Sequence, residues 1–289
     1  MIIDIHAHTS IRELQGLHTV DASLEYLRQR AKEFGIGKIY LMATYFPLKK
    51  SGLANRSLLE RIAEDPLFGC FGSLDLESNL FGGLEELDNL AESKLISGIK
   101  LYPGYQNVLL SDLRFRPVFQ LAEKYHLPVA CHLGELHHCC PKDSREKSQY
   151  RCGQNFCQLD QRGYLSRPYH LGKVARDFPN VNFIACHLAN PFFAELRAVM
   201  TELQNVYTDI SGQFLSGTSE DNPEYRLQLI AEITEFLRLD HGVERLLFGT
   251  DFPIQSYADT LSLVTALPLS SIDRQKVLSD NALKVLNLK

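Results

Sequence analysis

Two histidines separated by one residue, His6 and His8, stand at the end of the first apolar run of the chain. Side chains alternate between the two faces of a β-strand, so residues two apart point to the same face. Both imidazoles can therefore share one metal ion if this run is a strand. Because a pair with this spacing is common in proteins, further ligands are needed before a metal site is inferred.

Such ligands follow other strand-like runs. His132 and His187 end the fifth and sixth runs, and Asp251 follows the eighth. Imidazole nitrogens and carboxylate oxygens are preferred ligands of Zn²⁺ and similar divalent ions. Histidines can also be buried in a core without binding anything, but the placement of all these side chains at strand ends favours a shared metal site.

Eight short runs of apolar or β-branched residues, most followed by a segment with helical periodicity, determine the expected fold. The predicted strands are Ile2–Ile5, Lys38–Ala43, Phe68–Leu74, Gly98–Tyr102, Pro128–His132, Asn182–His187, Val206–Ile210 and Arg245–Gly249. The predicted helices cover residues 24–31, 84–95, 118–125, 171–178, 195–203 and 225–237. Repeated β-then-α units with short links predict an α/β fold, a parallel (β/α)8 TIM barrel. An open doubly wound sheet is the alternative, but no glycine-rich phosphate loop follows the first strand.

A polar segment between residues 135 and 167 interrupts this spacing. It carries several potential metal ligands, namely His137, His138, Cys139, Cys140, Cys152 and Cys157. A structural zinc site is one interpretation, but the usual two-residue gap between paired cysteines is missing. We expect instead a long inserted loop after the fifth strand that covers the barrel mouth, where loops set specificity.

The composition indicates an ordinary globular chain. Of its 289 residues, 45% are hydrophobic and 22% are charged, which suits one barrel domain spanning residues 1–289. The net charge of −5 shows no basic surface for nucleic acid. Seven cysteines, several inside predicted strands, favour reduced thiols in the cytoplasm. The sequence shows no secretory signal and no membrane-spanning run, so we expect no membrane partner.

Five stretches together resemble the amidohydrolase superfamily, and most closely its amidohydrolase-2 branch of barrel hydrolases and decarboxylases. They are Ile3-Asp4-Ile5-His6-Ala7-His8, Leu127-Pro128-Val129-Ala130-Cys131-His132, Phe183-Ile184-Ala185-Cys186-His187, Phe248-Gly249-Thr250-Asp251-Phe252-Pro253 and Asp280-Asn281-Ala282. The resemblance spans the whole chain. One departure is Ala189, where relatives often have glycine.

The resemblance implies a role for each ligand. The counterparts of His6, His8 and Asp251 bind a first ion. The counterpart of His132 joins them in members with one ion or binds a second ion in members with two, and that of His187 is a second-ion ligand or a catalytic hydrogen-bonding group.

Lys100, in Gly98-Ile99-Lys100-Leu101-Tyr102-Pro103, resembles the strand-four lysine that dihydroorotase-like members carbamylate to bridge two ions. A free ammonium has no lone pair for a cation, whereas a carbamate is an anionic oxygen ligand. An unmodified lysine that binds an anionic substrate or pairs with an acid is the alternative.

The expected function is hydrolysis of a small ester, lactone or amide, with a divalent ion, zinc above others, activating a water molecule. Asp251 would take a proton from that water, and His187 would donate a hydrogen bond to the developing oxyanion. A metal-dependent decarboxylase or hydratase is the alternative within the same resemblance. A barrel nuclease and a non-catalytic binding protein are less favoured, and formation of a homo-oligomer is left open. Tyr102, Tyr105 and Asp209 lie near strand ends, where they could contact substrate or anchor loops.

Overall fold

The computed structural model describes residues 1–11, 18–45, 52–137 and 157–288. Eight strands form one parallel sheet in chain order, β1 to β8. They are β1 (Ile2–Ala7), β2 (Ile36–Met42), β3 (Phe68–Gly72), β4 (Gly98–Leu101), β5 (Val129–Cys131), β6 (Phe183–Ala185), β7 (Val206–Asp209) and β8 (Leu246–Leu247). Backbone hydrogen bonds from Ile5 to Phe248 and from His8 to Phe252 join β1 to the β8 segment. The predicted TIM barrel is therefore confirmed, and each predicted strand overlaps an observed one.

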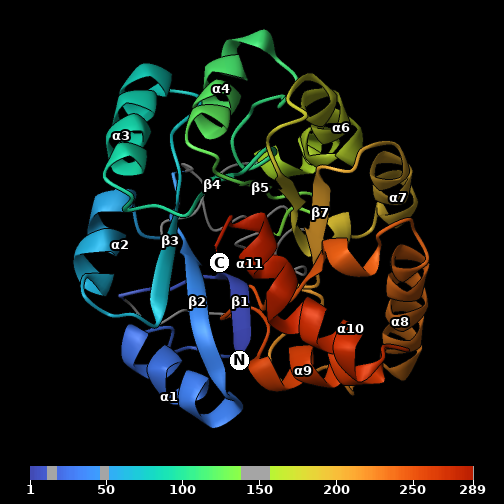
Figure 1. The fold of residues 1–289 in the computed structure, drawn as a ribbon. Helices are drawn as coiled ribbons and strands as arrows, with labels where there is room; N and C mark the ends of the chain where they lie inside the picture. The colour runs from blue at the N-terminus through green and yellow to red at the C-terminus, as the bar shows by residue number, and fades with distance from the viewer. Residues whose placement is uncertain (12–17, 46–51, 138–156, 289) are drawn as a thin grey trace.

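Helices surround the strands (Figure 1). They are α1 (Leu24–Phe34), α2 (Asn55–Ile62), α3 (Leu80–Glu92), α4 (Arg116–Lys124), α6 (Pro168–Asp177), α7 (Phe193–Glu202), α8 (Pro223–Leu237), α9 (Tyr257–Ala266), α10 (Ser271–Gln275) and α11 (Asn281–Val285). Local signals explain their ends: Ser23 caps α1 by accepting a hydrogen bond from Tyr26 N, and Gly35 ends it in the left-handed conformation. The described part of the chain has no helix long and apolar enough to cross a membrane.

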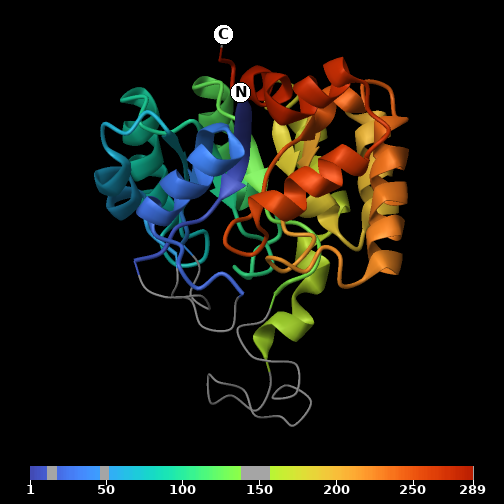
Figure 2. The same ribbon diagram turned by 90° about the horizontal axis from the view of Figure 1, so that it is seen from below.

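One end of the barrel is closed by the C-terminal helix. Ala282 and Val285 of α11 and the following Leu286 pack in one apolar cluster with inner side chains of the strands, such as Ile3 and Tyr40. Both termini lie at this end, whereas the short helices η2 (Gln158–Gln161) and η3 (Gly163–Ser166) extend from the other end (Figure 2). The carboxyl ends of the strands therefore form the open mouth.

Only the two ends of the predicted inserted loop, residues 135–137 and 157–167, fall within the described residues. There, Leu159 and the half-buried Cys157 pack against Tyr102, Tyr105 and Leu136. This segment thus contacts the loops that follow β4 and β5. The predictions on His138, Cys139, Cys140 and Cys152 lie outside the described residues.

The buried Asp4 carboxylate joins β1 to the turn that follows β8. Its Oδ1 accepts hydrogen bonds from His6 N at 3.0 Å and Thr250 N at 3.1 Å, and its Oδ2 accepts one from Thr250 Oγ1 at 2.7 Å. Asp251 follows Thr250 directly. Asp4 therefore holds the backbone of β1 at His6 and the backbone of the turn after β8 at Thr250.

Replacing this carboxylate tests the anchor. Asp4→Ala should lower the free energy of unfolding by roughly 1–3 kcal/mol, because buried N–H groups lose their acceptor. Urea denaturation measures the change, and the exposed Asp221→Ala is the control. An equal loss of stability in both variants would contradict the role of Asp4.

Candidate metal centre

Three of the predicted ligands converge at the mouth. The Oδ1 atom of Asp251 lies 3.2 Å from His8 Nε2 and 3.5 Å from His6 Nε2. One donor atom from each of the three side chains lies within 4.8 Å of the other two. His6 and Asp251 are buried, and His8 is partly exposed.

This arrangement fits a divalent cation. Ligand atoms bound to a tetrahedral ion at zinc distances lie roughly 3.3 Å apart, close to the observed separations. Two neutral imidazoles and one carboxylate also match the donors that zinc and similar ions prefer. Residues at opposite ends of the sequence thus form a group with the chemistry and spacing of a metal site.

A tight turn directs Asp251 toward the histidines. The Asp251 N–H donates to the His6 carbonyl at 2.7 Å, and Asp251 has a φ of 55°. Aspartate and asparagine adopt this left-handed conformation more readily than most residues. The residue type therefore suits both the backbone turn and the ligand role.

Lys100 reaches the same region from β4. Its fully buried Nζ lies 3.2 Å from His6 Nε2 and 3.0 Å from Cys186 Sγ, and 5.3 Å from the centre of the Tyr102 ring. The prediction that Lys100 is at the strand-end site is thus matched by its position. Its role as a ligand stays a prediction, and so do the two alternatives for its state, a carbamate that bridges two ions and an unmodified lysine.

His132 and His187 face each other on the other side of the mouth. His187 Nε2 lies 3.1 Å from His132 Nδ1, and His132 Nε2 lies 3.1 Å from the Glu135 carbonyl oxygen. Their ring nitrogens do not join the group formed by His6, His8 and Asp251 among the described residues. Metal binding by His132 or His187 therefore stays a prediction.

His187 does not end a strand as predicted. It lies in the short turn η4 (Cys186–Ala189), where residues 187–189 have φ values of 63°, 54° and 50°. Three successive left-handed residues without glycine are rare, and no periodicity in the sequence indicates them. The turn carries the His187 ring to the mouth beside Ser211, whose Oγ lies 2.9 Å from His187 Nδ1.

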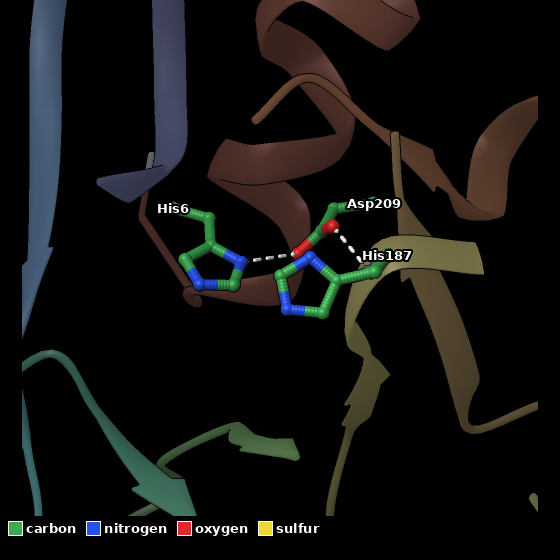
Figure 3. A group of neighbouring side chains, drawn as sticks. All are labelled: His6, His187 and Asp209. Carbon is green, nitrogen blue, oxygen red and sulfur yellow. Dashed lines mark hydrogen bonds and ion pairs between the residues drawn. The ribbon is translucent and has the colours of Figure 1, made fainter. Parts of the chain in front are cut away.

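Asp209, at the end of β7, belongs to the centre more closely than sequence reasoning indicated. Its Oδ2 lies 2.9 Å from His6 Nδ1, and its Oδ1 accepts a hydrogen bond from His187 N at 2.8 Å (Figure 3). His6, His187 and Asp209 form a second group with metal-ligand spacing. A carboxylate at a strand end was the available signal, but only the fold brings it to His6.

The charged states follow from burial and from neighbouring charges. Burial opposes ionisation of Asp251, but its hydrogen bond to His8 and the nearby histidines hold its pKa well below the usual value. Burial lowers the pKa of His187 to about 3, so its ring is neutral at neutral pH. Burial and Lys100 act to lower the pKa of His6, but the negative charges of Cys186 and Asp209 raise it to about 10.

A pocket of about 150 Å³ lies beside His187. It is lined by Leu133, Glu135, His137, His187, Asn190, Gly212, Gln213 and Tyr225. Gly212 lies against the centre, because a Cβ there would lie 3.0 Å from His187 Nδ1 and 3.1 Å from Asp251 Oδ2. The centre is thus next to a space for a small molecule.

Comparison with known sequences agrees with the fold and the motifs. The profile of the amidohydrolase family, amidohydrolase-2, matches residues 3–288. No curated protein matches the chain.

Solved structures share the barrel at low identity. An uncharacterised TIM-barrel protein from Bordetella bronchiseptica has a TM-score of 0.73 and 18% identity, covering 99% of this chain and 98% of that chain. A probable 2-pyrone-4,6-dicarboxylic acid hydrolase from Acinetobacter baumannii, with citric acid bound, has a TM-score of 0.66, 14% identity and 99% coverage of both chains. A dihydroxybenzoic acid decarboxylase from Polaromonas sp. JS666, with bound manganese and 2-nitroresorcinol, has a TM-score of 0.62, 17% identity and coverage of 93% and 87%.

Metal binding should depend on pH. With a pKa near 10, the His6 ring is protonated on both nitrogens at neutral pH, and a bound ion must displace one of these protons. The affinity for the ion should therefore fall as the pH falls, by up to about tenfold per pH unit. Calorimetric titration with Zn²⁺ in buffers of different ionisation enthalpy should show release of about one proton per ion. An affinity that does not vary between neutral and mildly acidic pH would contradict this assignment.

A methyl group on Gly212 should disturb the centre directly. Gly212→Ala places Cβ against His187 and Asp251 at a φ of 66°, so we expect a loss of stability of about 1 kcal/mol and weaker zinc binding. Thermal unfolding and chelator competition measure the two effects. Gly217→Ala is the matched control, because Gly217 also has a positive φ but has no atom within 4 Å of an added Cβ. Equal zinc affinity in both variants would remove Gly212 from the wall of the centre.

Proposed function

Because the chain belongs to the amidohydrolase family, we propose that it is a metal-dependent hydrolase that acts on a small ester, lactone or amide. The observation that carries this proposal is the convergence of His6, His8 and Asp251 on one point at the mouth of the barrel. The pocket lined by His187 and Gly212 adjoins this point.

The three converging side chains would hold one divalent ion, zinc above others. When bound, such an ion acidifies a water molecule and polarises a substrate carbonyl. Both groups of metal-ligand spacing among the described residues include His6. Since a neutral imidazole offers one lone pair to a metal, we propose a single ion and a free Lys100 amine held beside Cys186.

Asp251 and His187 would move and hold protons. Asp251 is ionised at neutral pH, and its Oδ1 faces the two histidines whereas its Oδ2 lies on the side of Gly212. Its Oδ2 can take a proton from an attacking water. His187 is neutral and lines the pocket, and its ring would form a hydrogen bond with a developing oxyanion.

A metal-dependent decarboxylase of a small carboxylated ring is the second candidate. The single group around Asp251 favours it, because lyases of this kind usually use one ion and need no bridging lysine. The similar structures include both a probable hydrolase and a decarboxylase. The two candidates share the same ion and differ in the bond that breaks.

Turnover of two substrate panels tests the proposal. The purified chain, freed of metal and reloaded with Zn²⁺ or Mn²⁺, should hydrolyse members of a panel of lactones, esters and amides and leave a panel of aromatic carboxylates unchanged. Release of carbon dioxide from the second panel alone would replace hydrolysis by decarboxylation. No turnover of either panel would remove both candidates.

Asp251→Asn is the internal control for this experiment. Asparagine tolerates the φ of 55° at this position, so the fold should persist, but turnover should fall by at least about a hundredfold because the general base is lost. Circular dichroism checks the fold. Mass spectrometry of the native protein checks that Lys100 lacks the added mass of carbon dioxide.

A further inference from the structure

We propose that Asp209 is a positioning residue that selects the Nε2 atom of His6 for the metal and also fixes the backbone of His187. This inference rests on the metal site of the proposed function. It assigns Asp209 a place outside the ligand set, although its spacing to His6 and His187 is that of a ligand.

The two nitrogens of His6 face different partners. Nδ1 lies 2.9 Å from Asp209 Oδ2, and Nε2 lies on the side of Asp251 and Lys100. A carboxylate can only accept a hydrogen bond, so Asp209 requires a proton on Nδ1. The lone pair of neutral His6 then lies on Nε2, which points to the donor atoms of Asp251 and His8. Carboxylate–histidine–metal arrangements of this kind orient the ring and raise its basicity as a ligand.

The other oxygen of Asp209 is used by the neighbouring turn. Oδ1 accepts hydrogen bonds from His187 N at 2.8 Å, from Ser211 N at 3.2 Å and from Ser211 Oγ at 2.5 Å. His187 begins the run of three left-handed residues, a conformation that is unfavourable for residues other than glycine. Asp209 therefore compensates part of this strain and holds a metal ligand and a proton-donating histidine in fixed relation.

These contacts also argue against Asp209 as a ligand. Both its oxygens are occupied by donors from β1, η4 and the segment after β7, and the side chain is fully buried. Metal binding between Asp209 and His6 would need the Nδ1 lone pair and would remove the hydrogen bond that orients the ring. The group around Asp251 requires neither change, and one of its members, His8, is partly open to solvent.

Asp209→Asn tests the role with almost no change in shape. An amide presents one oxygen and one NH₂. In either orientation the NH₂ group faces other donors, either the Nδ1–H of His6 or the N–H groups of His187 and Ser211. We expect zinc affinity to fall by about 10–100-fold, the usual effect of losing such a partner. Competition with a chromophoric chelator measures the affinity in the absence of any substrate. In the zinc-loaded wild type, ¹⁵N NMR should show His6 protonated at Nδ1 and metal-bound at Nε2.

Two further variants keep the test decisive. Thr208, which precedes Asp209 on β7, donates a buried side-chain hydrogen bond to Ala185 O of β6, so Thr208→Val reports a purely structural effect. His8→Gln removes a proposed ligand and sets the loss expected for direct coordination. Zinc affinity of Asp209→Asn that equals the wild type, or that falls no more than in Thr208→Val, would overturn the proposal. A loss equal to that of His8→Gln would make Asp209 a ligand and overturn it as well.

The outcome is separable from that of the proposed function. Zinc affinity and the state of the His6 ring need no substrate, so the role of Asp209 can hold even if neither substrate panel is turned over. Conversely, turnover of lactones with unchanged zinc affinity in Asp209→Asn would leave the function and remove only this inference.

Discussion

The site depends on the hydrogen bond between the Asp251 N–H and the His6 carbonyl, where the first and last strands of the barrel meet. Neither strand supplies the whole centre, because His6 lies in β1, His8 directly follows it, and the carboxylate lies in the turn after β8. Asp4 and Thr250 hold the same junction from its other side. A cation can therefore be bound by these three side chains only after the barrel has closed.

Charge balance within the closed barrel is as constrained as its geometry. His6 lies between the carboxylates of Asp209 and Asp251, and Lys100 Nζ lies 3.2 Å from His6 Nε2. Burying unpaired charges is costly, so positive and negative groups accumulate together. A divalent ion bound beside Lys100, as proposed, would be offset by the carboxylates on both sides of His6.

Much of this centre follows from the sequence. The eight strands have strong local patterns, and His6, His8 and Asp251 are placed by strand periodicity and by the rule that barrel sites form at strand ends. Helix α2 was not predicted, because its eight residues give little periodic signal. The turn at His187 and the contact between Lys100 and Cys186 could not be predicted, since both depend on tertiary packing. Asp209 carried a signal, its place at a strand end, but its partner is 203 positions away.

Helix α11 closes one end of the barrel, and this determines where the chain can be joined to other polypeptides. Both termini lie at the end that α11 closes, opposite the mouth (Figure 2). Tags, immobilisation linkers or neighbouring modules attached at either terminus would start on the side remote from the pocket, leaving its entrance unobstructed. The architecture thus separates the route of covalent attachment from the route of small-molecule entry.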